Sequence, residues 1–155
     1  MLLTRDETFR VVFNVRTPCD GEEKVGSGIF VAKSDSEGYL LTAAHVAKDC
    51  ASSTMIVISD ASGQAHTISL QKFNPTMSWR VHPAADLACL EVTPSEDIAN
   101  LLTGRFFPFS QFHGQATSVS RDDELTAVGF PHGFGATGLF SPLTYRSFAS
   151  SSLIT

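Results

Sequence analysis

The sequence has little charge, and its charges are not concentrated in any one segment. Charged residues make up 17% of the 155 residues, and the net charge is −5. The basic residues of the first third of the chain are scattered along it. A protein that binds nucleic acid through counterion release needs a basic stripe or patch, which is missing here. We therefore expect no nucleic-acid partner.

Long hydrophobic runs are also missing. No stretch approaches the roughly 20 apolar residues that span a bilayer. Arg5, Asp6 and Glu7 lie where a signal peptide would have its apolar region. From these two absences we expect no membrane association and a cytoplasmic location; a secreted or periplasmic location is the alternative if Met1 is not the true N-terminus.

Cysteine is sparse and has no metal-binding spacing. The chain has three cysteines, an odd number without a C-x-x-C pair, at Cys19, Cys50 and Cys89. We expect reduced, partly buried thiols, and a Cys19–Cys50 disulfide is the alternative. Metal binding needs three or four converging ligands, and no such spacing links Cys50 to the histidines His45, His82 and His132. The sequence predicts no metal site.

One glycine pattern matches a cofactor motif by its letters. Residues Gly133 to Gly138 read G-x-G-x-x-G, which is the dinucleotide fingerprint of an NAD-dependent oxidoreductase. That motif needs a helix after the glycines and then an acidic residue. Here Pro142 and β-type residues follow, and no acidic residue comes after them. We expect a loop at this position and no cofactor.

The sequence is rich in apolar residues (43%), with 12 Phe and 11 Gly, which favours a β-rich fold with many loops. Turn signals separate the second strand from the third and the fourth from the fifth, so both pairs are predicted to be hairpins. The spacing predicts a small β-barrel. Its six strands are expected at Phe9–Val15, Gly26–Lys33, Gly38–Ala43, Thr54–Ser59, Gln64–Phe73 and Asp86–Val92.

The pattern changes after this barrel. Thr93-Pro94-Ser95-Glu96 reads as a capping box, which predicts one short helix from Pro94 to Thr103, ended by Gly104. Strands are expected again at Glu124–Phe130 and Phe140–Phe148. The expected organisation is a first barrel over 1–104, a connector over 105–123 and the beginning of a second barrel over 124–155.

His45 carries the most specific signal. It follows small residues at the end of a predicted strand, and Asp86 begins another. If the fold brings the two together, the carboxylate accepts the Nδ1 proton and holds the imidazole as a general base. A strand-end histidine and a surface or capping aspartate are the structural alternatives. Asp35, Asp49 and Asp60 are the other candidate partners, but Asp49 is too near in sequence and the other two lie in turns.

The remaining histidines are expected to have other roles. We expect His82 to position the loop before Asp86, and His66 and His113 to be solvated.

Three segments in this order resemble the trypsin-like serine peptidases, which have the double-barrel chymotrypsin fold. They are "GSGIFVAKSDSEGYLLTAAHV" (26–46), "DLACLEV" (86–92) and "LTAVGFPHGFG" (125–135), and the first is similar to the bacterial branch of the family. The resemblance covers about residues 25–131. It implies an all-β chymotrypsin-like fold, peptide-bond hydrolysis by acyl transfer on a polypeptide substrate, and catalytic roles for His45 and Asp86.

The family's third catalytic residue is a serine in a G-x-S-G type segment, and the sequence has no such segment. Ser27 lies on the strand before the histidine, and Ser141 and Ser150–Ser152 lack the flanking glycines. We therefore expect a chain truncated before its nucleophile and inactive alone, with exposed strand edges that favour self-association. The alternative is a non-catalytic protein-binding or scaffolding module on the same fold.

Overall fold

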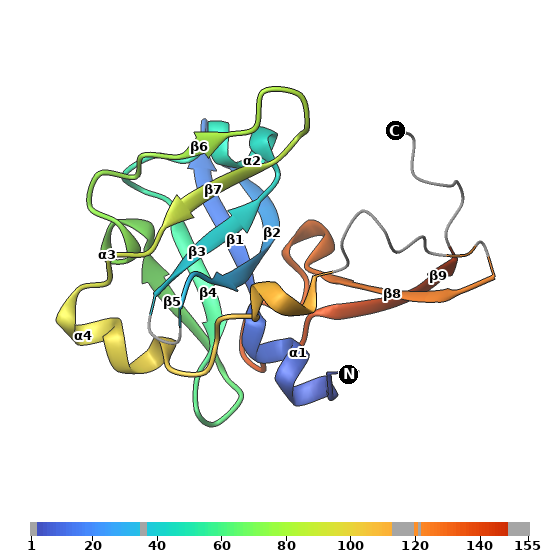
Figure 1. The fold of residues 1–155 in the computed structure, drawn as a ribbon. Coiled ribbons are helices and arrows are strands. Elements are labelled where there is room, and N and C mark those ends of the chain that lie inside the picture. Colours follow the sequence, from blue (N-terminus) through green and yellow to red (C-terminus); the bar gives the residue numbers. More distant parts are fainter. Residues whose placement is uncertain (1–2, 35–36, 113–119, 121, 149–155) are drawn as a thin grey trace.

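The computed structural model describes residues 3–34, 37–112, 120 and 122–148. An antiparallel seven-stranded sheet in the order β5-β4-β1-β2-β3-β7-β6 forms its main body. Figure 1 shows this sheet curled around its own interior. Its strands and the helices between them are α1 (Arg5–Val11), β1 (Val12–Cys19), β2 (Glu22–Ala32), β3 (Gly38–Thr42), α2 (Ala44–Lys48), β4 (Met55–Ser59), β5 (Ala65–Ser69), α3 (Leu70–Phe73), β6 (Arg80–Val81) and β7 (Ala88–Glu91).

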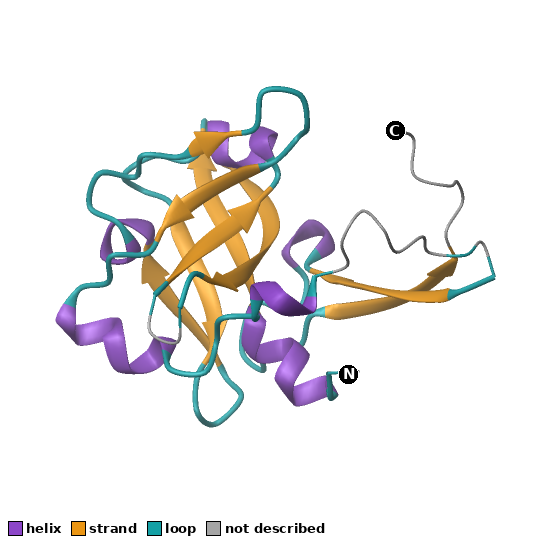
Figure 2. Ribbon diagram, viewed as in Figure 1, coloured by secondary structure: helices purple, strands orange, loops and turns teal. Residues whose placement is uncertain are grey.

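The second half of the chain adds short helices and one separate hairpin. β8 and β9 pair with each other and form a two-stranded sheet. Figure 2 shows this hairpin projecting to one side of the curled sheet. The elements of this half are α4 (Glu96–Ala99), η1 (Asn100–Leu102), η2 (Phe109–Gln111), β8 (Glu124–Gly129), η3 (Pro131–Gly133) and β9 (Leu143–Phe148).

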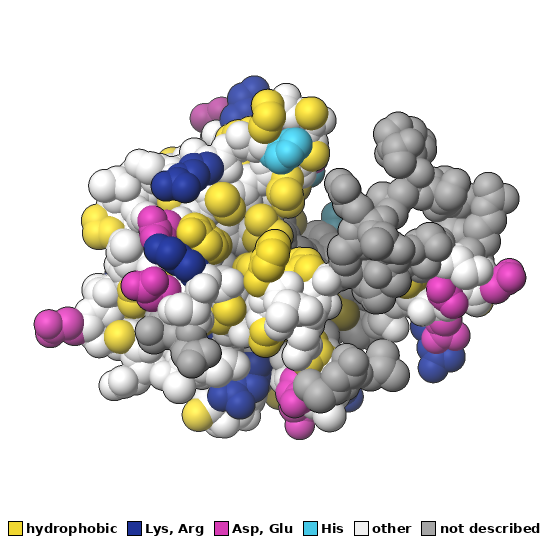
Figure 3. Space-filling model, in the orientation of Figure 1, with side chains coloured by type: hydrophobic (Ala, Val, Ile, Leu, Met, Phe, Trp, Pro, Cys, Tyr) yellow, Lys and Arg dark blue, Asp and Glu magenta, His cyan; other side chains and the backbone are white. Residues whose placement is uncertain are grey.

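Charge is scattered over the face of the molecule that Figure 3 shows. In Figure 3 the lysine and arginine side chains on the face in view lie apart from one another, often beside an acidic side chain. Among the described residues, Lys33 pairs with Glu91 at 2.8 Å and Lys24 with Asp49 at 3.0 Å. On that face no basic side chains gather into a patch.

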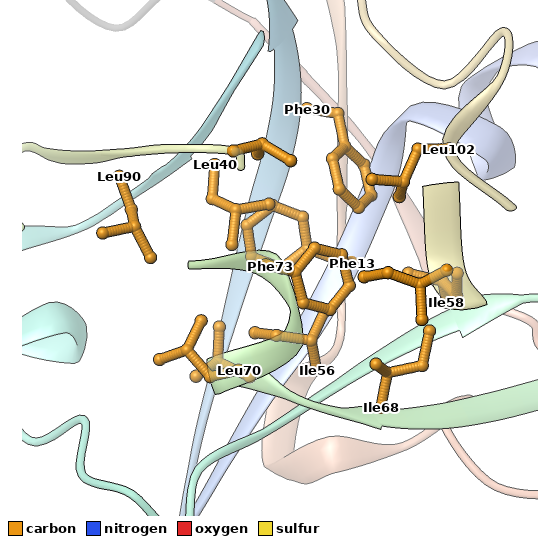
Figure 4. Close-up of a cluster of buried hydrophobic side chains, with 13 residues drawn as sticks. Phe13, Phe30, Leu40, Ile56, Ile58, Ile68, Leu70, Phe73, Leu90 and Leu102 are labelled. Carbon is orange, nitrogen blue, oxygen red and sulfur yellow. The ribbon is translucent and has the colours of Figure 1, made fainter. Parts of the chain in front are cut away.

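The main core lies inside the curled sheet (Figure 4). Phe13 and Phe30 are fully buried, and their rings meet edge to face with centroids 5.0 Å apart. Alternate residues of β3 point inward, which buries Leu40 and leaves Leu41 at intermediate exposure. This packing holds β1, β2 and β3 in place, and these strands lie next to His45.

A second cluster attaches the 124–148 segment to the sheet. Phe130 and Phe140 are buried with ring centroids 5.2 Å apart, in a cluster that also contains Val12 of β1. Two hydrogen bonds support the contact. The Phe130 N–H donates to Ser27 Oγ at 2.9 Å, and Arg16 Nη2 donates to the Gly133 carbonyl at 3.0 Å.

The structure confirms the all-β class and both predicted hairpins, β2–β3 and β4–β5. It corrects the expected strand Phe9–Val15, because α1 occupies its first three residues. A capping box explains this helix: the Glu7 N–H donates to Thr4 Oγ1 at 3.2 Å, and the Thr4 N–H donates to Glu7 Oε2 at 2.7 Å. The strand therefore begins only at Val12.

The expected strand Gln64–Phe73 is also shorter, because α3 takes its last four residues. Leu70 and Phe73 are both fully buried. Residues three apart face opposite sides of a strand but the same side of a helical turn, so one turn buries both. β6 was not predicted, and its two residues are exposed and carry no apolar pattern.

The helix predicted over Pro94–Thr103 begins two residues late, at Glu96. The N–H groups of Thr93 and Ser95 donate to the Phe73 and Lys72 carbonyls, so Thr93–Ser95 are held by α3 instead of forming a capping box. Ser95 is the N-cap but its hydroxyl contacts Asp97. The 3-10 turn η1 continues the helix, and Gly104 follows it with a positive φ of 71°, as the glycine predicts.

The three cysteines are free and partly buried, which confirms the expected thiols and excludes the Cys19–Cys50 alternative. Burial raises the pKa of the Cys50 thiol.

Candidate active site

His45 lies in the first turn of α2, immediately after β3. Ala43 keeps an extended conformation, and its carbonyl accepts the N–H groups of Val46 and Ala47 at 3.1 Å each, which begins the helix. The His45 side chain is 74% exposed. The imidazole is therefore presented to solvent at the end of a buried strand.

Asp86 lies in the loop between β6 and β7, next to β7. The Nδ1 atom of His82 accepts the N–H groups of Ala84 and Ala85 at 3.1 and 2.9 Å, which agrees with the expected loop-positioning role of His82. Asp86 itself is held from outside its loop, by His45.

The register of two strands explains why residues 41 positions apart meet. β3 and β7 are antiparallel neighbours, and Thr42 lies opposite Ala88. His45 comes three residues after the first of these and Asp86 two residues before the second, so both extend from the same end of the strand pair. The sheet thus positions the two side chains beside each other.

The contact between them is close and double. His45 Nδ1 lies 2.6 Å from Asp86 Oδ2, and the backbone N–H of His45 donates to Oδ1 at 2.9 Å. The pKa of Asp86 lies below its ordinary value. The hydrogen bond with the His45 ring is the largest cause, and the hydrogen bond with the His45 backbone is the next. A charged carboxylate at Nδ1 holds the ring proton there, which leaves Nε2 free to accept a proton.

The backbone hydrogen bond is a feature that the sequence analysis missed. The first N–H groups of a helix lack partners inside it, and an N-cap side chain often accepts one of them. Ala43 makes no such bond, so Asp86 takes this role from another strand. An alanine at the N-cap of a helix was the available signal.

A hollow of about 240 Å³ adjoins His45. Three of its seven lining residues are valines, and the Lys24–Asp49 ion pair lies beside them. The lining residues are Val15, Thr17, Lys24, Val25, His45, Val46 and Asp49.

The structure brings His45 and Asp86 together and does not bring the other candidates to them. Asp49 pairs with Lys24, and Asp60 Oδ1 accepts the N–H groups of Ser62 and Gln64 within its own turn. His66 is exposed, as expected. Asp35 and His113 lie outside the described residues.

No nucleophile contacts the imidazole within the described part of the chain. Ser27 Oγ accepts the N–H of Phe130, and none of the described hydroxyl or thiol groups forms a hydrogen bond with His45. Ser150–Ser152 lie outside the described residues. The described site thus consists of a hydrogen-bonded histidine–aspartate pair beside a hollow.

Among the residues that the structure describes, no three or more His, Cys, Asp or Glu side chains converge as metal ligands. None of the helices described is both long enough and apolar enough to cross a membrane.

Comparison with known proteins bears on this site. The family model of the trypsin-like peptidase domain matches residues 26–152. The crystal structure of the serine endoprotease from Yersinia pestis has a similar fold, with a TM-score of 0.52 and 18% sequence identity. The match covers 97% of this chain and 46% of that one, so this chain spans about half of the solved protein. No curated protein sequence matches the chain.

Proposed function

Because the chain belongs to the trypsin-like peptidase domain family, we propose that it supplies the histidine and aspartate of a serine-type endopeptidase. The observation that carries the proposal is the short contact between His45 Nδ1 and Asp86 Oδ2. The substrate is a polypeptide, and no metal or organic cofactor takes part. The reaction is hydrolysis of a peptide bond by acyl transfer.

His45 acts twice in this reaction. Nε2 first takes the proton of a serine hydroxyl as the serine oxygen bonds to the scissile carbonyl carbon. The imidazolium then gives that proton to the departing amine as the carbon–nitrogen bond breaks. Water then attacks the resulting ester: Nε2 takes a proton from the water as the water oxygen bonds to the acyl carbon, and gives it to the serine oxygen as the ester bond breaks, which regenerates the serine. Asp86 stabilises the positive ring and keeps the proton on Nδ1.

The nucleophile has to come from outside these 155 residues, because they contain no G-x-S-G segment. The oxyanion hole of the family belongs to the same segment. Without these two parts no acyl-enzyme forms. We therefore propose that the 155-residue chain alone is inactive and that a protein containing the missing segment is active.

Labelling with a fluorophosphonate probe tests the proposal. The longest natural protein that contains these residues should be labelled, and its H45A variant should not. The matched control is H66A, which removes an exposed histidine on β5. If that natural protein is folded and is not labelled, the result would contradict the peptidase function.

The second candidate function is a protein-binding module without catalysis. The observation in its favour is a groove of about 420 Å³ with more apolar than polar lining, to which Thr126 and Val128 of β8 contribute. Its apolar walls include Val12, Ile29, Leu41 and Val128. A module would bind polypeptides with unchanged affinity in the H45A variant and would cleave none of them.

We also propose that the β8–β9 hairpin mediates self-association. Leu125, Leu143 and Tyr145 are 40%, 40% and 48% exposed. The hairpin register places them on one face, opposite the face of Thr126 and Val128 that lines the groove. A second copy of the chain would remove this apolar face from water.

A further inference from the structure

The short helix that carries His45 has little stability of its own. α2 has five residues, and its N-cap provides no side-chain hydrogen bond. Isolated helices shorter than about 12–15 residues are marginal in water. The position of His45 is therefore set by what α2 packs against.

Val46 of α2 packs closely against Gly26 of β2. A Cβ atom placed on Gly26 would lie 2.6 Å from Val46 Cγ1 and 2.8 Å from Cγ2. Distances below 3.0 Å are not tolerated by real Cβ atoms, so even one added methyl group would displace Val46. Gly26 does not have a positive φ. The glycine is needed for space and not for its backbone conformation.

β2 is held firmly at this point and cannot move away from the helix. Gly26 pairs with Val15 in the register of β1 and β2. Its carbonyl accepts a hydrogen bond at 2.8 Å from Nδ2 of Asn14, a fully buried side chain. Any added volume at Gly26 is therefore transmitted to α2.

A second contact joins the same two elements. Lys24 lies two residues before Gly26 on β2, and its Nζ is 3.0 Å from Asp49 Oδ2, at the C-cap of α2. Residues two apart face the same side of a strand. One face of β2 thus holds α2 in its middle and at its end.

We propose that Gly26 is a positioning residue for His45: because position 26 has no side chain, Val46 has room beside β2, and this room lets α2 lie where His45 contacts Asp86. Val46 is the residue directly after His45, so a displacement of its side chain moves the imidazole. The inference rests on the proposed role of His45 in catalysis. Its test measures NMR signals of His45 and Asp86 and does not measure catalysis. The positioning role of Gly26 and the peptidase function can therefore fail separately.

The test compares G26A, V46A and the double variant G26A/V46A in the 155-residue chain. The first readout is the proton resonance of the hydrogen-bonded Nδ1–H of His45. The second is the titration of the Asp86 carboxyl group, followed by carbon NMR. G26A should lose the Nδ1–H resonance and raise the pKa of Asp86 toward its ordinary value. V46A should keep both wild-type signals, because it removes methyl groups and adds none.

The double variant is decisive. Removing the two Cγ atoms of Val46 makes room for the alanine methyl group at position 26, so G26A/V46A should recover the Nδ1–H resonance and the low pKa of Asp86. Thermal unfolding of each variant separates this effect from a loss of stability. If G26A alone does not fold, the double variant should still fold and show the paired signals.

Two results would overturn the inference. One is a folded G26A chain with unchanged His45 and Asp86 signals. The other is a double variant that recovers neither the fold nor the signals.

Discussion

Asp86 accepts two hydrogen bonds from a single residue, His45, one from its ring and one from its backbone. The first orients the imidazole, and the second takes the place of the side-chain cap that Ala43 cannot provide. Substitution of Asp86 therefore changes both the chemistry of the ring and the beginning of the helix that carries it.

The first prediction concerns D86N in the longer natural protein that we propose to be a peptidase. An asparagine amide in place of the carboxylate favours the wrong imidazole tautomer, and in a serine–histidine–aspartate triad this lowers kcat by about 10⁴-fold. Steady-state hydrolysis of a peptide substrate would measure it. The matched control is D97N, which removes an exposed carboxylate that contacts Lys72 and Ser95. Equal rates for D86N and wild type would contradict the triad role of Asp86.

The second prediction is a dependence of stability on pH. The pKa of Asp86 is lowered in the folded chain, so the folded state stabilises the ionised carboxylate. This contribution is fully present above the pKa of the unfolded chain, and it is lost as the pH falls through the lower pKa of the folded chain. Glu7, Asp60, Glu91 and Asp97 also have lowered pKa values, so the wild type alone does not isolate Asp86.

A comparison with D86N isolates it. Urea unfolding of both proteins across the acidic range should give the larger difference in the free energy of unfolding near neutral pH. That difference should shrink as Asp86 becomes protonated. A constant difference across the range would show that the ionisation of Asp86 does not stabilise the fold.

The third prediction concerns Ser27, whose Oγ accepts the N–H of the buried residue Phe130. S27A leaves this N–H without its partner, and an unsatisfied buried donor costs about 1–3 kcal/mol. Urea unfolding would measure the loss, and the amide of Phe130 should exchange faster with solvent. S78A is the control, because the Ser78 hydroxyl donates to the hydroxyl of an exposed threonine, Thr76. If S27A lowers the free energy of unfolding no more than S78A does, this hydrogen bond does not hold the 124–148 segment on the sheet.

The sequence predicts the parts of this fold that depend on local patterns. Alternation and turn residues indicate the β2–β3 and β4–β5 hairpins, and the small residues before His45 mark the end of β3. The sequence predicts the contact of His45 with Asp86 only if the fold brings the ends of their two strands together. The register of β3 and β7 fulfils this condition, and no local pattern specifies that register.

The features that the sequence did not predict depend on distant partners. α3 forms because a helical turn buries both Leu70 and Phe73 in the core. Backbone hydrogen bonds to α3 replace the capping box expected at Thr93. The contact of Gly26 with Val46 joins a strand to a helix, and the glycine does not have the positive φ that would mark a turn. Only the assembled structure shows why a glycine is needed there.

The last prediction concerns the outer face of the β8–β9 hairpin. Leu125, Leu143 and Tyr145 share this face, and burying exposed apolar side chains against a second copy is favourable at roughly 25 cal/mol per Å². The 155-residue chain should therefore show a mass that increases with concentration in sedimentation equilibrium. Threonine keeps the preference for a strand while it removes apolar surface, so L125T/Y145T should shift the chain toward the monomer.

The control is T144S, which alters the opposite face of the same hairpin, beside Val128. It should associate as the wild type does, because the outer face is unchanged. Hydrogen exchange adds a second measure: the amides of β8 and β9 should be better protected in concentrated than in dilute wild-type samples. A wild-type chain that stays monomeric at all concentrations would exclude this face as a self-association surface. An association that L125T/Y145T does not weaken would place the interface elsewhere on the chain.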